Sequence, residues 1–493
     1  MKLKNSLYIL TLPLLLAVFA CSKKTANDNP PPTTGGDGGG TTTTPVKTDV
    51  KMWLTTADKS QLLSKQNISL LFGTTTNSNS IISVDTTQTY QNIDGFGFAL
   101  TGGSAYVINA LPITQRDALL NELFSPTDST AIGISYIRIT IGASDMSATP
   151  FTYDDMPTGS TDVSLTNFSI SPELTDLIPV LKKIVSINPN IKILACPWTA
   201  PVWMKTNTIG NNGFEGGSLN TAYYATYAQY FVKYIQAMAA QGINIDAVTC
   251  QNEPLNAYNT PAMLMQATEE ATFIKNNLGP AFQAAGIKTK IIAYDHNCDH
   301  PEYATTVLGD AGASPFVDGS AFHLYAGNIS AMSTVHNAYP NKNLYFTEQA
   351  TFSNGTFSGD LNWHITNLIV GATRNWSRNV IEWNLASDAN FGPHTTGGCG
   401  TCQGAVTVSG GAVSRNVSYY IIAHAAKFVR PGAVRIASDA SSALPNVAFK
   451  NTDGSKVLIV LNNSANTQSF NIKFNSKIVT STLQGGAVAT YKW

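Results

Sequence analysis

The sequence predicts an α/β fold, a (β/α)8 TIM barrel with a side β-sandwich. From about residue 94 onward, short apolar segments of strand character alternate with segments of helical periodicity. This alternation is typical of a parallel barrel. The strand candidates are residues 94–100, 136–142, 191–198, 246–254, 290–296, 319–326, 343–350 and 380–386.

A doubly wound open sheet is the alternative arrangement of the same elements. No G-x-G-x-x-G pattern follows the first strand candidate, although such sheets often use that pattern to bind dinucleotides. Polar residues instead recur at the carboxyl ends of the strands. Because those ends form the active face of a barrel, the barrel is the preferred interpretation.

Helical segments lie between the strand candidates. Residues 114–124 begin at Thr114, a residue type that caps helices, and their leucines share one face. Two longer helices are expected at 223–242, which ends on Gly242, and at 260–279, which starts with Thr-Pro and stops at a glycine.

The chain changes character after a closing helix expected at 418–433. The tail consists of alternating strands separated by turns. A few strands alone need a partner face, and the segment before the barrel can supply further strands. We therefore expect residues 49–92 to join a C-terminal β-sandwich at 433–493, with the catalytic barrel at 93–432.

Residues 1–21 have the pattern of a targeting signal. A basic start precedes an apolar run that is short for a membrane span and ends at Cys21. The pattern resembles a bacterial lipoprotein signal, in which Cys21 is lipidated; cleavage without lipidation is the alternative. Residues 22–48 are rich in Pro, Gly and Thr and are interpreted as a flexible linker. We expect an exported cell-envelope or cell-surface protein, otherwise a secreted one, with membrane contact only through that anchor.

Composition narrows the class of ligand. Charged residues make up 12% of the 493 residues and the formal net charge is −1. This balance gives no support for binding nucleic acid or an anionic membrane surface. Low charge with many hydroxyl and amide side chains suits a protein that handles neutral ligands.

The remaining cysteines fall into two groups. Cys196, Cys250 and Cys298 lie in apolar or strand-like contexts and are interpreted as buried thiols. Cys399 and Cys402 form a lone C-x-x-C, and no second pair completes a zinc site. In an exported protein, a disulfide that clamps this Gly-rich loop is the preferred interpretation.

Two glutamates carry the strongest chemical signal. Glu253 follows the fourth strand candidate within "TCQNEP", and Glu348 ends the seventh within "NLYFTEQA". Both would point into the mouth of the barrel from the same face. One such Glu alone is more often part of a satisfied ion pair. Two that face each other suit glycoside hydrolysis, in which one protonates the leaving oxygen and the other attacks the sugar carbon.

The sequence from about residue 90 to the C-terminus resembles glycoside hydrolase family 30. The resemblance rests on "IDGFGFALTGGSA", "YIRITIGASDMSATPFTYDD", "ACPWTAPVWMKTN", "FHLYAG", "IEWNLA" and the two glutamate motifs, in this order. That family contains retaining enzymes with a barrel and a side β-sandwich, including lysosomal glucosylceramidase and β-1,6-glucanases. The resemblance implies that Glu253 is the acid/base and Glu348 the nucleophile, and it implies no cofactor and no metal.

The resemblance also implies roles for neighbouring residues. Asn252 would bind the sugar 2-hydroxyl, and Arg138 would keep Glu348 ionised and aimed. A structural salt bridge is the alternative interpretation of Arg138, and both can hold at once. Tyr325 would donate to the nucleophile, whereas an inward His323 is more often a satisfied core residue than a proton carrier. The remaining substrate-binding candidates are Asp145, Trp198 and Trp383. For Trp203 plain packing is as good an interpretation as function.

These residues are compatible with three functions to different degrees. The first is a retaining β-glycosidase that acts on a β-glucan or other β-glucoside. It is placed nearer the β-1,6-glucanase branch because residues 397–408, "GGCGTCQGAVTV", resemble that branch. A glucosylceramidase-like β-glucosidase is the alternative. The second is a carbohydrate-binding lipoprotein without activity, which would need neither Glu253 nor Glu348. The third, a metal-dependent hydrolase, lacks a convincing cluster of ligands, since only His323 and Asp295-His296 approach one.

Overall fold

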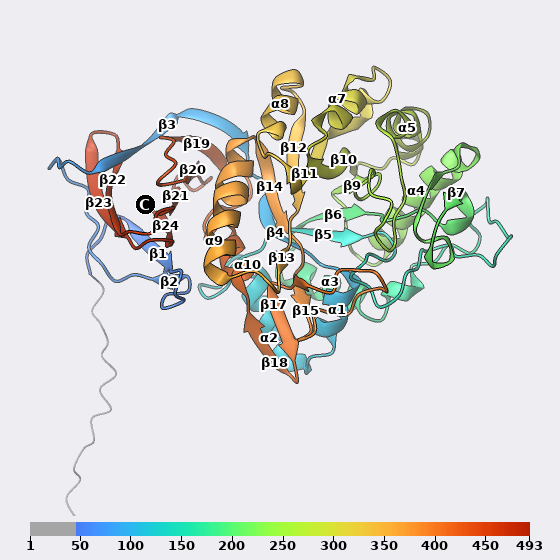
Figure 1. Ribbon diagram of the computed structural model, residues 1–493, viewed down its shortest axis with the longest axis horizontal. Helices are drawn as coiled ribbons and strands as arrows, with labels where there is room; N and C mark the ends of the chain where they lie inside the picture. Colours follow the sequence, from blue (N-terminus) through green and yellow to red (C-terminus); the bar gives the residue numbers. More distant parts are fainter. Residues whose placement is uncertain (1–45) are drawn as a thin grey trace, which may run out of the picture. The chain divides into compact units, whose positions relative to one another are not determined.

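The computed structural model describes residues 46–493 (Figure 1). The predicted signal, Cys21 and nearly all of the predicted linker lie outside the described residues. Within residues 46–493, no helix combines the length and the apolar character that crossing a membrane requires.

Eight parallel strands close into a barrel in the order β10-β11-β12-β14-β4-β5-β6-β9, which confirms the predicted fold class. Each predicted strand overlaps an observed one. The strands are β4 (Gly95–Ala99), β5 (Tyr136–Thr140), β6 (Lys192–Cys196), β9 (Ala247–Thr249), β10 (Lys290–Cys298), β11 (Val317–Gly327), β12 (Asn343–Glu348) and β14 (Ser377–Glu382).

Helices connect successive barrel strands and pack outside them (Figure 1). Their apolar residues join those of the strands in one continuous core. The helices are α1 (Gly102–Asn109), α2 (Ile113–Phe124), α3 (Leu177–Ile187), α4 (Tyr224–Ala240), α5 (Ala267–Phe273), α6 (Gly279–Ala284), α7 (Pro301–Gly309), α8 (Ala331–Ala338), α9 (Phe357–His364) and α10 (Val417–Ala426).

Three helix predictions need correction at their ends, and one of them is the closing helix expected at 418–433, since α10 already ends at Ala426. Helix α2 is already wound at Ile113, because the backbone N–H of Arg116 donates to the carbonyl oxygen of Pro112 at 2.9 Å. Thr114 is therefore inside the helix and is not its N-cap. The predicted end of helix α4 is confirmed, since Gly242 follows it with φ of +78°, a conformation that glycine adopts without strain.

The helix expected at 260–279 is shifted along the chain. Helix α5 begins only at Ala267, where Gln266 and Glu269 form a capping box. At the other end, Gly279 does not stop the helix, which continues through a π-turn into α6. A Cβ atom at Gly279 would lie 2.3 Å from the ring of Phe316, so this glycine permits close packing instead of ending the helix.

The barrel interior is layered along its axis. One buried apolar cluster takes a residue from each of seven barrel strands: Tyr136, Leu194, Ala247, Ile292, Ala321, Tyr345 and Ile381. Because side chains alternate across a strand, residues two positions further on also face inward. Those positions include Arg138, Thr249 and His323, so the apolar layer forms a floor beneath a polar layer.

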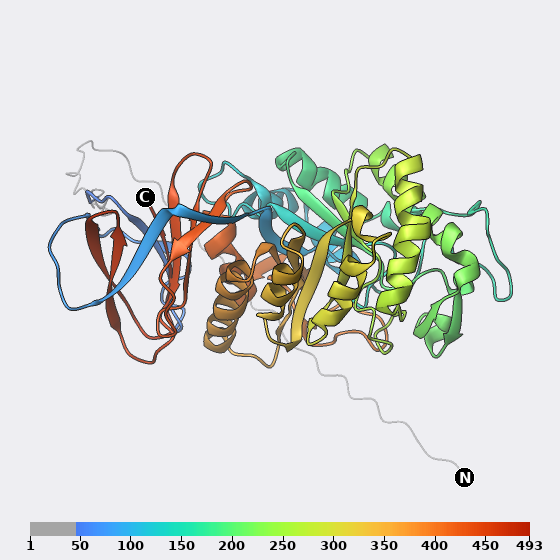
Figure 2. The same cartoon turned by 90° about the horizontal axis from the view of Figure 1, so that it is seen from above.

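The second sheet has nine strands in the order β2-β1-β24-β21-β20-β19-β3-β22-β23. Figure 2 shows the blue N-terminal strands lying among the red C-terminal ones, as the predicted sandwich requires. The strands are β1 (Lys51–Thr55), β2 (Ser64–Lys65), β3 (Ser80–Asn92), β19 (Val434–Ser438), β20 (Asn446–Lys450), β21 (Lys456–Leu461), β22 (Gln468–Phe474), β23 (Lys477–Leu483) and β24 (Val488–Lys492).

Strand β3 joins the two halves of this sheet. Its first residues pair in parallel with β22, and its later residues pair antiparallel with β19 across two register shifts. The strands enclose a separate apolar core that includes Met52, Ile82, Phe470 and Tyr491. The pre-barrel segment thus supplies strands without which the C-terminal sheet could not close around its own core.

A buried histidine fastens the barrel to this sheet. The hydroxyl of Thr490 donates to the carbonyl oxygen of His424 at 2.9 Å, which leaves its oxygen to accept from Nδ1–H, also at 2.9 Å. The hydroxyl oxygen of Thr55 accepts from the backbone N–H of Leu63 and lies 2.8 Å from Nε2 of His424. With its proton on Nδ1, the neutral imidazole can accept a hydrogen bond from the Thr55 hydroxyl, so both ring nitrogens are satisfied without a charge on the ring.

We predict that this contact makes the fold sensitive to acid. Burial lowers the pKa of His424 to about 3, against roughly 6.5 in the unfolded chain. The stability from the neutral imidazole is fully present above about pH 6.5 and falls by about 1.4 kcal/mol per pH unit below it, down to the folded pKa. His424→Gln should therefore flatten the slope of unfolding free energy against pH between about pH 6.5 and 4.5.

Denaturant unfolding at several pH values measures this slope. The same substitution at His394, which is exposed, is the matched control and should leave the slope as in wild type. A His424→Gln protein with an unchanged slope would contradict the assignment.

Candidate active site

A cavity of about 520 Å³ opens at the carboxyl ends of the barrel strands. Its wall includes six of the residues predicted for the site: Asp145, Trp198, Glu253, Tyr325, Glu348 and Trp383. Arg138 and His323 lie beneath them and are fully buried. Trp203 is not part of this wall; it is half-buried and its ring N–H donates to the carbonyl oxygen of Asp154 at 2.9 Å.

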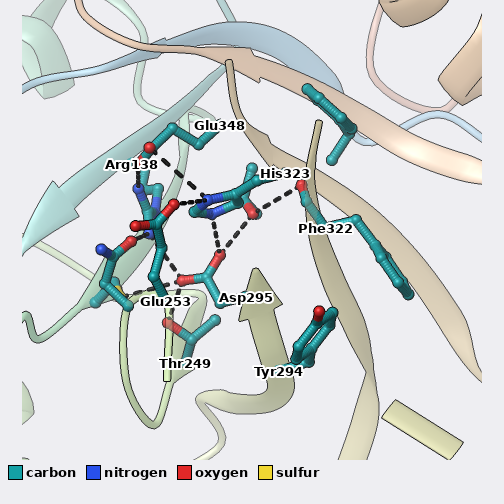
Figure 3. Close-up of polar contacts among 12 residues, drawn as sticks. Arg138, Thr249, Glu253, Tyr294, Asp295, Phe322, His323 and Glu348 are labelled. Carbon is teal, nitrogen blue, oxygen red and sulfur yellow. Dashed lines mark hydrogen bonds and ion pairs between the residues drawn. The ribbon is translucent and has the colours of Figure 1, made fainter. Parts of the chain in front are cut away.

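The two glutamates face each other across this cavity (Figure 3). A carboxylate oxygen of Glu253, one of Glu348 and a ring nitrogen of His323 all lie within 4.8 Å of one another. Glu348 is the last residue of β12. Glu253 follows β9 and has a φ of +44°, a left-handed conformation that costs free energy and is often found at functional sites.

Arg138 holds one of the two glutamates from below. It lies in the middle of β5, and its long side chain reaches upward to donate to Oε2 of Glu348 at 2.5 Å. Its other terminal nitrogen donates to Oδ1 of Asn252 at 2.7 Å and to Oδ2 of Asp295 at 2.8 Å. The guanidinium also lies 4.8 Å from the ring centre of Trp198. These contacts fix both the guanidinium and the carboxylate it binds.

Asp295 is the central residue that the sequence analysis did not assign to the site. It is fully buried and accepts hydrogen bonds from Arg138, from the hydroxyls of Thr249 and Thr347, and from His323. Simple alternation along β10 would have pointed it outward. A register shift between Tyr294 and the following residues, with φ of +71° at Asp295, turns its side chain inward.

His323 occupies the centre of the cluster (Figure 3). Its Nδ1 lies 3.2 Å from Oε1 of Glu253 and 3.7 Å from Oε1 of Glu348, and its Nε2 lies 3.1 Å from Oδ1 of Asp295. The imidazole is therefore more than a satisfied core residue. It joins a buried acid on one side to both candidate catalytic carboxylates on the other.

The pKa values of Glu253 and His323 shift in opposite directions. Burial raises the pKa of Glu253, but the hydrogen bond and charge of His323 outweigh it and bring the pKa down to about 2. Burial likewise lowers the pKa of His323, but the charges of Glu348 and Asp295 raise it to about 9. In the free protein, the proton that an acid/base residue needs is therefore held on the Glu253–His323 pair, nearer the imidazole.

Glu348 and Asp145 have raised pKa values. Burial raises the pKa of Glu348, while His323 and Arg138 act against that rise. Arg138 lowers the pKa of Glu348, as expected, but desolvation of the carboxylate is the larger effect. Burial, with the charges of Glu348 and Glu253, raises the pKa of Asp145 to about 7. A half-protonated Asp145 can both donate to and accept from a hydroxyl group.

Two indole rings line the part of the cavity near Asp145. The ring centres of Trp198 and Trp383 lie 5.3 Å apart, and both side chains are almost completely buried. The hydroxyl of Tyr325 donates to Oε1 of Glu348 at 3.1 Å. These positions agree with a pocket in which apolar faces and hydroxyl-binding groups surround one sugar ring.

The loop after the last barrel strand closes this side of the cavity. A disulfide joins Cys399 and Cys402, and both cysteines line the cavity. Strand β16 (Cys402–Gln403) pairs with β13 (Thr351–Phe352), which follows β12. The N–H of Thr395 donates to the carbonyl oxygen of Asp145 at 2.8 Å. Cys196, Cys250 and Cys298, in contrast, are buried free thiols, as predicted.

The same cluster contains the one group of possible metal ligands found among residues 46–493: Glu253, His323 and Glu348. Each of these side chains already has partners. Glu348 is paired with Arg138, and both ring nitrogens of His323 are bonded to carboxylates. A cation here would have to displace a proton and compete with a guanidinium, so the arrangement suits acid–base chemistry better than metal binding.

A parallel barrel with two facing carboxylates, a buried cation beneath one of them and indole rings beside them defines a glycoside hydrolase. Comparison with known families makes this specific. Residues 93–429 match the glycosyl hydrolase family 30 TIM-barrel domain, and residues 432–491 match the β-sandwich domain of the same family. The chain belongs to glycosyl hydrolase family 30.

Several curated proteins are similar over most of the chain. An endo-1,6-β-D-glucanase of Aspergillus fumigatus is 38% identical over 78% of this chain and 82% of its own length. An endo-1,6-β-D-glucanase of Trichoderma harzianum is 37% identical over 78% of this chain and 80% of its own. The lysosomal acid glucosylceramidase of Mus musculus is 28% identical over 84% of this chain and 83% of its own.

Solved structures show the same pattern. An endo-β1,6-glucanase structure superposes with a TM-score of 0.84 at 37% identity, covering 91% of this chain and 99% of that one. The catalytic domain of a family 30 xylanase from Talaromyces cellulolyticus superposes with a TM-score of 0.65 at 26% identity, covering 84% of this chain and 99% of that one.

Proposed function

We propose that the protein is a retaining β-glycosidase that cleaves β-1,6-linked glucan by double displacement. The main support for this mechanism is the spacing of Glu253 and Glu348, whose nearest carboxylate oxygens lie no more than 4.8 Å apart. Retaining enzymes hold their carboxyl groups roughly 5–5.5 Å apart, whereas inverting enzymes leave about 6.5–9.5 Å for a water molecule. The linkage is supported by the similarity to the endo-1,6-β-D-glucanases.

In the first step, Glu348 attacks the anomeric carbon and the bond from that carbon to the leaving oxygen breaks. Arg138 and Tyr325 each bind one oxygen of Glu348, which aims the carboxylate. Glu253 gives a proton to the leaving oxygen as that bond breaks. Indole faces and Asp145 hold the sugar ring while it flattens.

The proton for this step comes from the Glu253–His323 pair. Glu348 is the strongest group that raises the pKa of His323. When Glu348 becomes an ester, its negative charge is lost, and the imidazolium loses that support. The proton then moves across the 3.2 Å contact to Glu253, so formation of the covalent bond favours protonation of the leaving group.

In the second step, Glu253 acts as a base. It takes a proton from water while the water oxygen attacks the anomeric carbon and displaces Glu348. The proton returns to the Glu253–His323 pair, and Glu348 is again paired with Arg138. The net reaction is hydrolysis with two inversions, hence retention of the β configuration.

Paired substitutions separate the two roles. Glu348→Gln should abolish the covalent glycosyl-enzyme formed from 2,4-dinitrophenyl 2-deoxy-2-fluoro-β-glucoside, because a carboxamide is a poor nucleophile. Glu253→Gln should still form it, because the dinitrophenolate leaves without a proton, but should lose activity on glucan by about 10²–10⁴-fold. Intact-protein mass spectrometry detects the adduct.

Glu382→Gln is the matched control for these variants. Glu382 is equally buried, but its carboxylate is paired with His364 on α9 and lies away from the cavity. This variant should form the adduct and cleave glucan. Loss of adduct formation in both Glu348→Gln and Glu253→Gln to the same extent would mean that the roles are wrongly assigned.

A comparison of substrates tests the proposed linkage. We expect kcat/KM to be higher on linear β-1,6-glucan than on glucosylceramide dispersed in detergent. The cavity wall contains many amide, hydroxyl and charged groups, which suit a neutral polysaccharide better than acyl chains. Steady-state rates on both substrates measure this preference. β-1,3-Glucan, β-1,4-glucan and xylan are included for comparison. Equal or faster cleavage of glucosylceramide would overturn the glucanase proposal and leave the retaining mechanism standing.

We also propose that the protein is exported and anchored through lipid on Cys21. The support is the sequence alone, namely the basic and apolar start and the Pro-, Gly- and Thr-rich stretch after it. Cys21→Ala should release an active enzyme from the membrane fraction, since two or more acyl chains are needed for stable attachment. A wild-type protein that is already soluble and carries no lipid by mass spectrometry would refute the anchor.

A further inference from the structure

The strand order divides the wall of the cavity into two halves. Glu253 follows β9, and β9 is neighboured by β10 and then β11. Because the acid/base residue must reach the leaving oxygen, the half built on β9, β10 and β11 faces the leaving group. The opposite half, built on β12, β14, β5 and β6, contains the nucleophile, Asp145 and the two indoles, and so faces the sugar that is attacked.

The leaving-group half has an unusual exposed aromatic residue. Tyr258 lies on the loop after β9, lines the cavity and is 84% exposed. It is the most exposed of the large hydrophobic side chains among residues 46–493. An aromatic ring that is exposed beside a cavity offers a flat apolar face to a ligand. Sugars present a matching apolar face to aromatic rings.

Asn256 connects this ring to the acid/base residue. Its Nδ2 donates to Oε2 of Glu253 at 2.8 Å, and its Oδ1 accepts from the backbone N–H of Tyr258 at 3.0 Å. One amide group therefore fixes the position of the catalytic oxygen relative to the backbone that carries the tyrosine. A sugar resting on Tyr258 would have a defined position relative to the proton it is to receive.

His296 supplies a polar group on the same half. The side chain lines the cavity and is only 8% exposed, and its Nδ1 is buried with no hydrogen-bond partner in the described part of the chain. A buried polar atom without a partner is rare and needs a cause. Burial lowers the pKa of His296 to about 4, so at neutral pH this nitrogen belongs to an uncharged ring that suits a hydroxyl group.

We propose that Tyr258, Asn256 and His296 form a binding site for a glucosyl unit on the leaving-group side of the cleaved bond. The ring of Tyr258 supports the apolar face of that sugar, and His296 bonds one of its hydroxyls. The inference rests on the proposed retaining glycosidase and assigns to these three residues the binding of the sugar that leaves. In the second step the same site holds an acceptor sugar, so that the enzyme transfers as well as hydrolyses.

The matched substrates are a linear β-1,6-gluco-oligosaccharide and β-glucosyl fluoride, whose fluoride ion occupies no sugar-sized site. Tyr258→Ala should lower the ratio of kcat/KM on oligosaccharide to kcat/KM on the fluoride by about tenfold or more, because binding energy away from the reacting bond stabilises the transition state. Tyr258→Phe keeps the ring face and should keep that ratio within about twofold. Tyr106→Ala removes a 55% exposed tyrosine on α1 outside the cavity and is the control, with the ratio of wild type.

A second readout does not depend on the linkage. With β-glucosyl fluoride as donor, added gentiobiose should divert part of the glycosyl-enzyme into a longer oligosaccharide, and Tyr258→Ala should lose most of that product. If β-1,6-glucan is not cleaved, the linkage proposal fails, and laminaribiose and cellobiose as acceptors still test the site. Equal loss on both substrates in Tyr258→Ala, or transfer that this variant leaves unchanged, would overturn the inference.

Discussion

The active site depends on a buried ion pair between Arg138 and Glu348, held at 2.5 Å above an apolar floor. Removing charges from water is costly, and further hydrogen bonds to the paired groups offset part of that cost. Asp295 and Asn252 bind one terminal nitrogen of the guanidinium and Glu348 binds the other, whereas Nε is buried without a hydrogen-bond partner in the described part of the chain. The carboxylate that we propose as the nucleophile is thus held in place before any substrate arrives, and such preorganisation favours fast chemistry.

The charges around this pair explain how the site can bind a positively charged transition state. Two cations, Arg138 and protonated His323, lie among three carboxylates, those of Glu253, Asp295 and Glu348. The excess of negative charge lies where the sugar ring gains oxocarbenium character. The position of one proton, on the imidazole or on Glu253, then decides whether the site is resting or ready to release the leaving group.

Much of this arrangement could be predicted from the sequence, because strand alternation and strand order determine it. Glu253 lies shortly after one buried strand and Glu348 ends another, and in a barrel the side chains at these strand ends converge. Asp295 could not be placed in this way, since a register shift with left-handed backbone reverses the direction of its side chain. Alternation assumes a regular strand, and β-bulges at active sites break that assumption.

The helix boundaries were misplaced for a related reason. Thr114 and Gly279 have the residue types of helix ends, but the helices there are determined by a backbone bond to Pro112 and by packing on the ring of Phe316. Tyr258 was also missed, because an exposed tyrosine in a loop has no sequence signal that separates it from an ordinary surface residue. Its significance appears only when the loop is seen beside Glu253.

The central claim is that Glu348 attacks the sugar directly and Glu253 activates water from the same face that the leaving group departs. Proton NMR of the first product formed from β-glucosyl fluoride tests this, because the anomeric signal is read before mutarotation. β-Glucose should appear first and the α-anomer only later. Initial release of α-glucose would mean a single displacement by water, and would contradict the role given to Glu348 and the arrangement around it.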